Sequence, residues 1–151
     1  SHRVSLWILH IRNMLHIKRE EFIPDEVYDK LPTAMKKMID EAAGCYEHNY
    51  LTACVVMLRK ILEDSIQLKF EKEDKVGELY DENNCRISLE EMIEKAKQFH
   101  YISPKNANQL VENEHFGDAR AHSYKIELWQ GNIIPCVELV RLVLEELFYK
   151  K

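Results

Sequence analysis

Residues 46–66 read YEHNYLTACVVMLRKILEDSI, and this stretch decides the fold of the chain. From residue 50 onward, apolar side chains recur at steps of three and four, which is the spacing of one face of an α-helix. The pattern predicts one long helix over residues 50–71. Its apolar set consists of Tyr50, Ala53, Val56, Met57, Ile61, Leu62, Ser65 and Leu68.

A second amphipathic helix is predicted upstream, over residues 33–48. It follows Pro24 and Pro32, and its apolar positions are Met35, Met38, Ile39, Ala42 and Tyr46. The connection HNY between the two helices is so short that we expect an antiparallel hairpin. We interpret the methionines of these helices, Met35, Met38 and Met57, as filler of the core.

Two start signals predict further helices downstream. Ser88 followed by Glu91 is a capping-box pattern and opens the segment SLEEMIEKAKQF. Ser103 and Pro104 are a cap and a first-turn proline, which open another helix. Between the long helix and the first of these signals, we expect the charged segment EKEDKVGELYDENN to be a solvated excursion with a short helical turn.

The end of the chain predicts one more helix, which begins after Gly131 and Pro135. Its apolar positions are Val137, Val140, Leu144, Leu147 and Phe148. Taken together, these segments predict an all-α fold, an up-and-down antiparallel bundle of about five helices.

The first residues are less clear. Across residues 3–22, Val4, Trp7 and Ile11 recur near helical spacing, but Leu6 and Ile8 also fit a buried strand. We favour a helix and divide the chain into an N-terminal segment, residues 1–24, and a helical domain, residues 25–151. Because the sequence begins with serine rather than methionine, we expect it to be a piece of a longer protein, with residues 1–24 as a linker.

The composition limits the function. With a net charge of -5, the chain has no bulk attraction for nucleic acid, so any such site must be a local cleft. The four cysteines form no CxxC pair, which argues against a zinc ribbon or a disulfide framework and favours the cytoplasm. No apolar run is long enough to span a bilayer, so we expect no membrane partner. There is no glycine-rich phosphate loop, and we predict no cofactor.

The segment HFGDARAHSY, residues 115–124, gathers the polar residues that could carry chemistry. On one continuous helix, His115, Asp118 and His122 would share a face and could bind a divalent metal. Gly117 favours a break instead, so we predict no metal site and interpret the histidines as helix-end caps. In the long helix, Arg59 and Glu63 lie four residues apart. They are interpreted as a structural pair, and the alternative is that Arg59 reaches toward this turn.

Together, YEHNYLTACVVMLRKILEDSI, SLEEMI, GDARAHSY and the apolar terminal helix resemble the HEPN superfamily (higher eukaryotes and prokaryotes nucleotide-binding). Within it, they are similar to the domain of unknown function attached to bacterial restriction and defence proteins. The resemblance spans roughly residues 26–149. It implies a helical bundle that dimerises, with an Arg and His motif from each protomer facing a shared cleft. In active relatives this motif cleaves RNA without a metal, since the histidine moves a proton and the arginine steadies the phosphate.

The motif of this branch is Arg, two residues, Gly-Asn, three residues, His. Gly117 takes the glycine position, Asp118 that of asparagine and His122 that of histidine, but the arginine position falls on Glu114. A carboxylate there would repel phosphate. Arg120 could substitute only if the turn is irregular, because residues two apart on a helix point in nearly opposite directions. Arg59, or an arginine of the partner protomer, is the other substitute.

Two functions therefore remain. The favoured one is a HEPN-like dimerisation or interaction domain of a prokaryotic defence or restriction system, associated with RNA or a nucleotide but with a degenerate catalytic motif. The alternative is an active, metal-independent endoribonuclease in which His122 is the acid-base and Arg120 or Arg59 binds phosphate. The expected partners are a second copy of the chain, RNA or a nucleotide in the dimer cleft, and a fused or separate defence protein.

Overall fold

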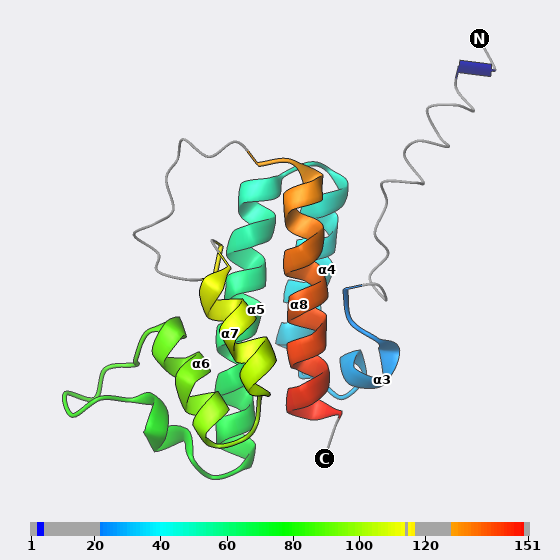
Figure 1. Cartoon of the computed structure of the whole chain (residues 1–151). Helices are drawn as coiled ribbons and strands as arrows, with labels where there is room; N and C mark the ends of the chain where they lie inside the picture. Colours follow the sequence, from blue (N-terminus) through cyan, green and yellow to red (C-terminus); the bar gives the residue numbers. More distant parts are fainter. Residues whose placement is uncertain (1–2, 5–21, 114, 117–127, 150–151) are drawn as a thin grey trace.

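The computed structural model describes residues 3–4, 22–113, 115–116 and 128–149 (Figure 1). In this part of the chain the predicted all-helical class is confirmed. The elements are α3 (Asp25–Tyr28), α4 (Thr33–Glu47), α5 (Leu51–Lys72), the 3-10 helix η1 (Val76–Leu79), α6 (Leu89–Gln98), α7 (Pro104–Glu112) and α8 (Gln130–Phe148). Figure 1 shows α4 and α8 running along α5, with α6 packed beside α5 and α7 packed against α6 and α8.

The predicted hairpin of α4 and α5 is confirmed, and each helix end lies within one residue of the expected position. Helix α4 ends at Glu47 and α5 begins at Leu51. Between them Asn49 has a φ of 63°, in the left-handed region that asparagine tolerates. The N–H of Tyr50 then bonds the carbonyl of Cys45 at 2.8 Å, which closes the turn. This short turn obliges the two helices to pack along their length.

In its first half, helix α5 buries a different face from the one that the sequence pattern predicts. Its buried residues are Leu51, Cys54, Leu58, Ile61, Leu62, Ser65, Ile66 and Phe70. By contrast, Tyr50 is 65% exposed and Val56 is 59% exposed. The first half of α5 is apolar on two sides, and the side of Leu51, Cys54 and Leu58 is the buried one in the described part of the chain. The three- and four-residue spacing cannot distinguish which of two apolar faces is covered.

Helix α8 packs against α5 and begins earlier than predicted, at Gln130. Gly131 and Pro135 therefore lie inside the helix and not before it. Pro135 lies in the second turn, where its missing N–H removes one hydrogen bond near the helix start. Burial of Ile133, Cys136 and Val137 on one face compensates, since each contributes apolar area to the core.

The start signals of α6 and α7 are confirmed. Ser88 is the N-cap of α6, and its Oγ accepts the N–H of Glu91 at 3.2 Å. The carboxylate of Glu91 in turn accepts the N–H of Ser88 at 3.5 Å, which completes the capping box. Ser103 caps α7 by accepting the N–H of Asn106 at 3.2 Å, with Pro104 as the first helical residue.

The excursion between α5 and α6 contains the predicted short helical turn, η1, but it is more than a solvated loop. Leu79 at the end of η1 is completely buried. Tyr80 and Arg86 form an antiparallel bridge, and Asp81 Oδ1 accepts the N–H groups of Asn83 and Cys85, both at 2.9 Å. The loop from Tyr80 to Arg86 is therefore ordered by its own hydrogen bonds.

At the start of the described domain, Phe22 and Ile23 are buried, and the Phe22 ring meets the Tyr46 ring edge-on at 6.4 Å. The core therefore includes residues 22 and 23, just upstream of the predicted domain start at residue 25. The choice between helix and strand for residues 3–22 falls largely outside the described residues. None of the helices described here is both long and apolar enough to cross a membrane.

Candidate functional site

Most of the predicted site falls on residues whose structure is not described. Those outside the described ranges are Glu114, Gly117, Asp118, Arg120 and His122. Arg59 and His115 are described, and the structure brings these two together. The described part of the site consists of the turn at His115 and the residues of α5, α7 and α8 around it.

His115 lies in a turn just after α7, and Asn113 holds that turn. The side-chain oxygen of Asn113 accepts the N–H of His115 at 2.8 Å, and its carbonyl accepts the N–H of Phe116 at 3.2 Å. His115 is only 4% exposed and Phe116 is fully buried. The ring of Phe116 thus anchors the chain in the core directly before Gly117.

Arg59 contacts this turn from α5. Its Nη1 donates to the backbone carbonyl of His115 at 3.4 Å, and its Nε lies 4.0 Å from Glu63 Oε1. Both interpretations of Arg59 therefore hold: it pairs with Glu63 along the helix, and it reaches the turn that leads to the motif. A guanidinium has five N–H donors, so one arginine can make both contacts.

Arg86 extends the same cluster and was missed in the sequence. Its Nη2 lies 2.9 Å from Glu63 Oε2, and its Nη1 donates to Gln67 Oε1 at 2.7 Å. Glu63 therefore stands between two arginines, Arg59 and Arg86. No spacing rule connects residues 63 and 86, because the loop that carries Arg86 sets the contact.

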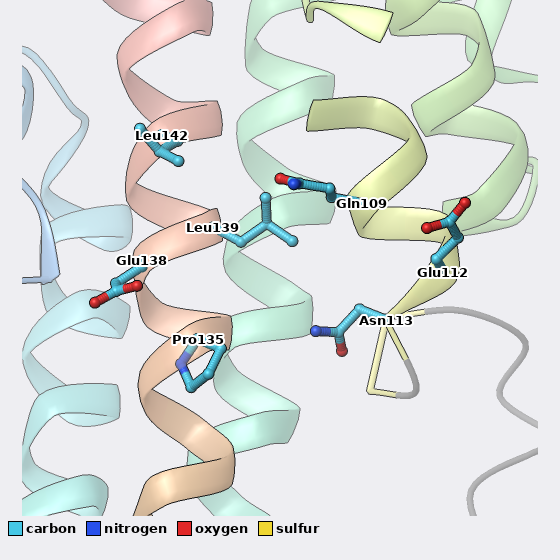
Figure 2. A pocket seen from close by; sticks show the side chains of 7 residues that line it. All are labelled: Gln109, Glu112, Asn113, Pro135, Glu138, Leu139 and Leu142. Carbon is cyan, nitrogen blue, oxygen red and sulfur yellow. The ribbon is translucent and has the colours of Figure 1, made fainter. Parts of the chain in front are cut away.

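Asn113 was also missed, although an asparagine at a helix end is a recognisable turn signal. Besides holding His115, its Nδ2 lies 3.6 Å from the Cys136 thiol of α8. Figure 2 shows Gln109 and Asn113 pointing toward α8 across a pocket of about 360 Å³, whereas the carboxylate of Glu112, which also lines the pocket, points away from α8. The α8 residues of this pocket are Pro135, Glu138, Leu139 and Leu142. The turn before the motif thus borders a pocket whose lining includes two glutamates.

A second pocket, of about 350 Å³, lies on the other side of α7 and is more acidic. Its lining residues are Glu90, Glu91, Glu94, Asn108, Val111 and Glu112. Glu112 lines both pockets. Carboxylates on both sides of α7 make this part of the surface unfavourable for the phosphates of RNA.

A third depression has the opposite character and lies between α4 and α5. We call it the α4–α5 groove; it measures about 550 Å³. Its lining residues are Glu41, Gly44, Cys45, His48, Tyr50, Ala53, Val56 and Met57. It contains the first four residues of the predicted apolar set, of which Tyr50 and Val56 are more than half exposed and Met57 is partly buried against the core. A Cβ added to Gly44 would meet no atom within 4 Å, so the groove is open there.

Cys54 is not a candidate nucleophile. All four cysteines are free, and the side chain of Cys54 is fully buried. Burial raises the pKa of Cys54 to about 12, and the nearby thiols of Cys45 and Cys136 add to this increase. A thiol that stays protonated at neutral pH is a poor nucleophile.

Among the described residues, no three histidine, cysteine or acidic side chains are placed to hold a metal ion. The proposed ligand set of His115, Asp118 and His122 includes two residues outside the described ranges. Comparison of the chain with protein-family models, with curated proteins and with solved structures gives no match.

Proposed function

We propose that this chain is a HEPN-like helical interaction domain that pairs with a second copy of itself and does not cleave RNA. The observation that carries the proposal is the α4–α5 groove, where an apolar helix face predicted from the sequence is left uncovered by the described chain. Association with a prokaryotic defence or restriction system, with RNA or a nucleotide, and with the cytoplasm rests on the resemblance alone.

The groove has the character of a protein-binding surface. Tyr50 and Val56 are both more than half exposed. Met57 and Cys45, which also line the groove, are partly buried against the core. Contiguous apolar surface of this kind, bordered by polar residues such as Glu41 and His48, marks interaction sites on soluble domains. A two-fold pairing would cover the same residues on both protomers, which satisfies the symmetry of most homodimers.

The charge around the turn at His115 supports a role without cleavage. Arg59, the one described residue among the three that we predict to be catalytic, donates to the backbone carbonyl of His115 and lies 4.0 Å from Glu63, whose negative charge offsets its own. The acidic pockets on either side of α7, and Glu114 at the motif's arginine position, add repulsion for a phosphate.

The pairing is tested by sedimentation velocity of the purified chain. We expect the wild type to sediment as a dimer, and Val56→Asp and Gly44→Leu to sediment as monomers. The first variant places a charge in the groove and the second fills it. Leu142→Asp is the matched control, since Leu142 is a 40% exposed leucine on α8, outside the groove. A monomeric wild type, or a dimer that survives both groove variants, would refute the proposed interface.

One observation favours the nuclease alternative: Arg59 lies beside the segment that leads into residues 117–122. The test is incubation of labelled RNA with the chain in EDTA, from about pH 6 to pH 9. We expect no cleavage. Cleavage that disappears in His122→Ala, while the fold is retained, would establish the nuclease instead and give Arg59 or Arg120 the phosphate-binding role.

If the motif residues are structural, their removal should weaken the fold. We expect Asp118→Ala and His122→Ala each to lower the free energy of unfolding by about 1 to 3 kcal/mol, the cost of leaving a buried polar partner unpaired. Thermal melting measures this loss. Unchanged melting of both variants would exclude the structural role for this pair.

A further inference from the structure

We infer that Arg86 is a positioning residue for the turn at His115: through Glu63 it orients Arg59, and Arg59 in turn holds the carbonyl of His115. The chain of contacts starts on the loop before α6, crosses α5 and ends on the turn after α7. The inference does not depend on whether two copies pair through the α4–α5 groove.

The two carboxylate oxygens of Glu63 contact different arginines. Arg86 Nη2 lies 2.9 Å from Oε2, whereas Arg59 Nε lies 4.0 Å from Oε1. The carboxylate is planar, so fixing one oxygen also limits where the other can point. The shorter contact therefore sets the orientation of Glu63, and the longer one follows it. Without Arg86, Glu63 would be held by Arg59 alone and could rotate with it.

Arg86 is well suited to act as the fixed end. Its backbone bridges to Tyr80, and the next residue, Ile87, donates its N–H to the carbonyl of the buried Leu79 at 2.9 Å. Its side chain also donates to Gln67, one turn beyond Glu63 on α5, at 2.7 Å. Two bonds to α5 and an anchored backbone leave the Arg86 guanidinium little freedom.

The cluster is also sheltered enough for its charges to matter. The side chains of Arg86, Glu63 and Arg59 are 33%, 28% and 24% exposed, in that order. Exposure therefore decreases toward the turn, and solvent screens the inner contact less than the outer one. The positive charge of Arg86 attracts the Glu63 carboxylate and holds it in place, which in turn favours the position of Arg59 beside the His115 carbonyl.

The reporter for this chain of contacts is the carbonyl carbon of His115, followed by triple-resonance NMR. Losing a hydrogen bond to a carbonyl moves its ¹³C resonance upfield, so Arg59→Gln gives the reference change. We expect Arg86→Gln and Glu63→Gln to move the same resonance in the same direction. We also expect Arg86→Gln to have no further effect in the Arg59→Gln background, because both then act on one contact.

Lys95→Gln is the matched control. It breaks the 3.4 Å ion pair between Lys95 and Glu78, which links α6 to η1, and should leave the His115 resonance unchanged. Arg86→Lys should restore part of the change, since a lysine keeps the charge but cannot bridge Glu63 and Gln67 together. An unmoved His115 carbonyl in Arg86→Gln, or an equal effect with and without Arg59, would overturn the inference. If Arg86→Gln does not fold, Arg86→Lys decides: the inference stands if this variant moves the His115 carbonyl only when Arg59 is present, and falls if the carbonyl does not move.

Discussion

Glu146 of α8 holds the start of α7 by bonding both polar groups of Ser103. Its Oε2 accepts the Ser103 N–H at 2.7 Å and its Oε1 accepts the Ser103 hydroxyl at 3.0 Å. The side-chain amide of Asn106 donates to the same Oε1. One carboxylate thus satisfies three donors at the beginning of a neighbouring helix, where backbone N–H groups lack partners within the helix.

We therefore expect Glu146→Ala to lower the free energy of unfolding by about 1 to 3 kcal/mol, because it leaves partly buried donors unpaired. Urea denaturation followed by circular dichroism measures the loss. Glu145→Ala, which removes the same charge one position earlier, should change the stability much less. Equal losses in the two variants would mean that net charge, and not the cap of α7, is responsible.

The N-cap of α6 gives a second prediction. We expect Ser88→Ala to cost about 1 kcal/mol, since the N–H of Glu91 loses its acceptor. Ser88→Gly should cost only a few tenths of a kcal/mol, because glycine leaves the helix end open to water. Equilibrium unfolding of both variants gives the comparison. A glycine variant less stable than the alanine variant would contradict the role of the cap.

The buried hydroxyl of Ser65 predicts a substitution that does not lower the stability of the fold. Its hydroxyl is fully buried in α5, and within the described part of the chain no hydrogen-bond partner is found for it. A buried hydroxyl without a partner carries a desolvation cost, and alanine is the better helix former. We expect Ser65→Ala to leave stability unchanged or raise it by up to about 1 kcal/mol. A clear decrease in melting temperature would show that the hydroxyl makes a stabilising contact.

The raised pKa of Cys54 predicts how stability falls in alkali. Its ordinary pKa is 9.0, and burial raises it to about 12 in the folded chain. Between these values the unfolded chain releases a proton that the folded chain keeps, so stability decreases as the pH rises. The added slope is at most about 1.4 kcal/mol per pH unit.

Urea unfolding at a series of alkaline pH values tests this for Cys54→Ala, which should show a flatter dependence than the wild type. Cys85 is exposed, so Cys85→Ala is the control and should leave the slope unchanged. If Cys54→Ala keeps the full alkaline slope, other groups account for it.

Helices α4, α5, α6 and α7 could be predicted from local sequence rules. The hairpin of α4 and α5 followed from apolar spacing and a short connection, and α6 and α7 followed from Ser88, Glu91 and Ser103. These signals depend on residues a few positions apart, so the sequence contains them in full. The predicted start of α8 was wrong. Burial of Ile133 and Cys136 stabilises the first turns of the helix despite the helix-breaking effect of Pro135, and this burial depends on the neighbouring helices.

The site could be predicted only in part, for the same physical reason. The all-helical class, the Arg59–Glu63 pair and the polar turn at His115 could all be predicted from residue types and their spacing. Three contacts could be seen only in the packed structure: Glu63 also binds Arg86, Asn113 holds His115, and one of the two apolar faces of α5 is left uncovered by the described residues. Each of these contacts joins segments far apart in the chain. Their distance is set by how the helices pack, and residue spacing carries no record of that packing.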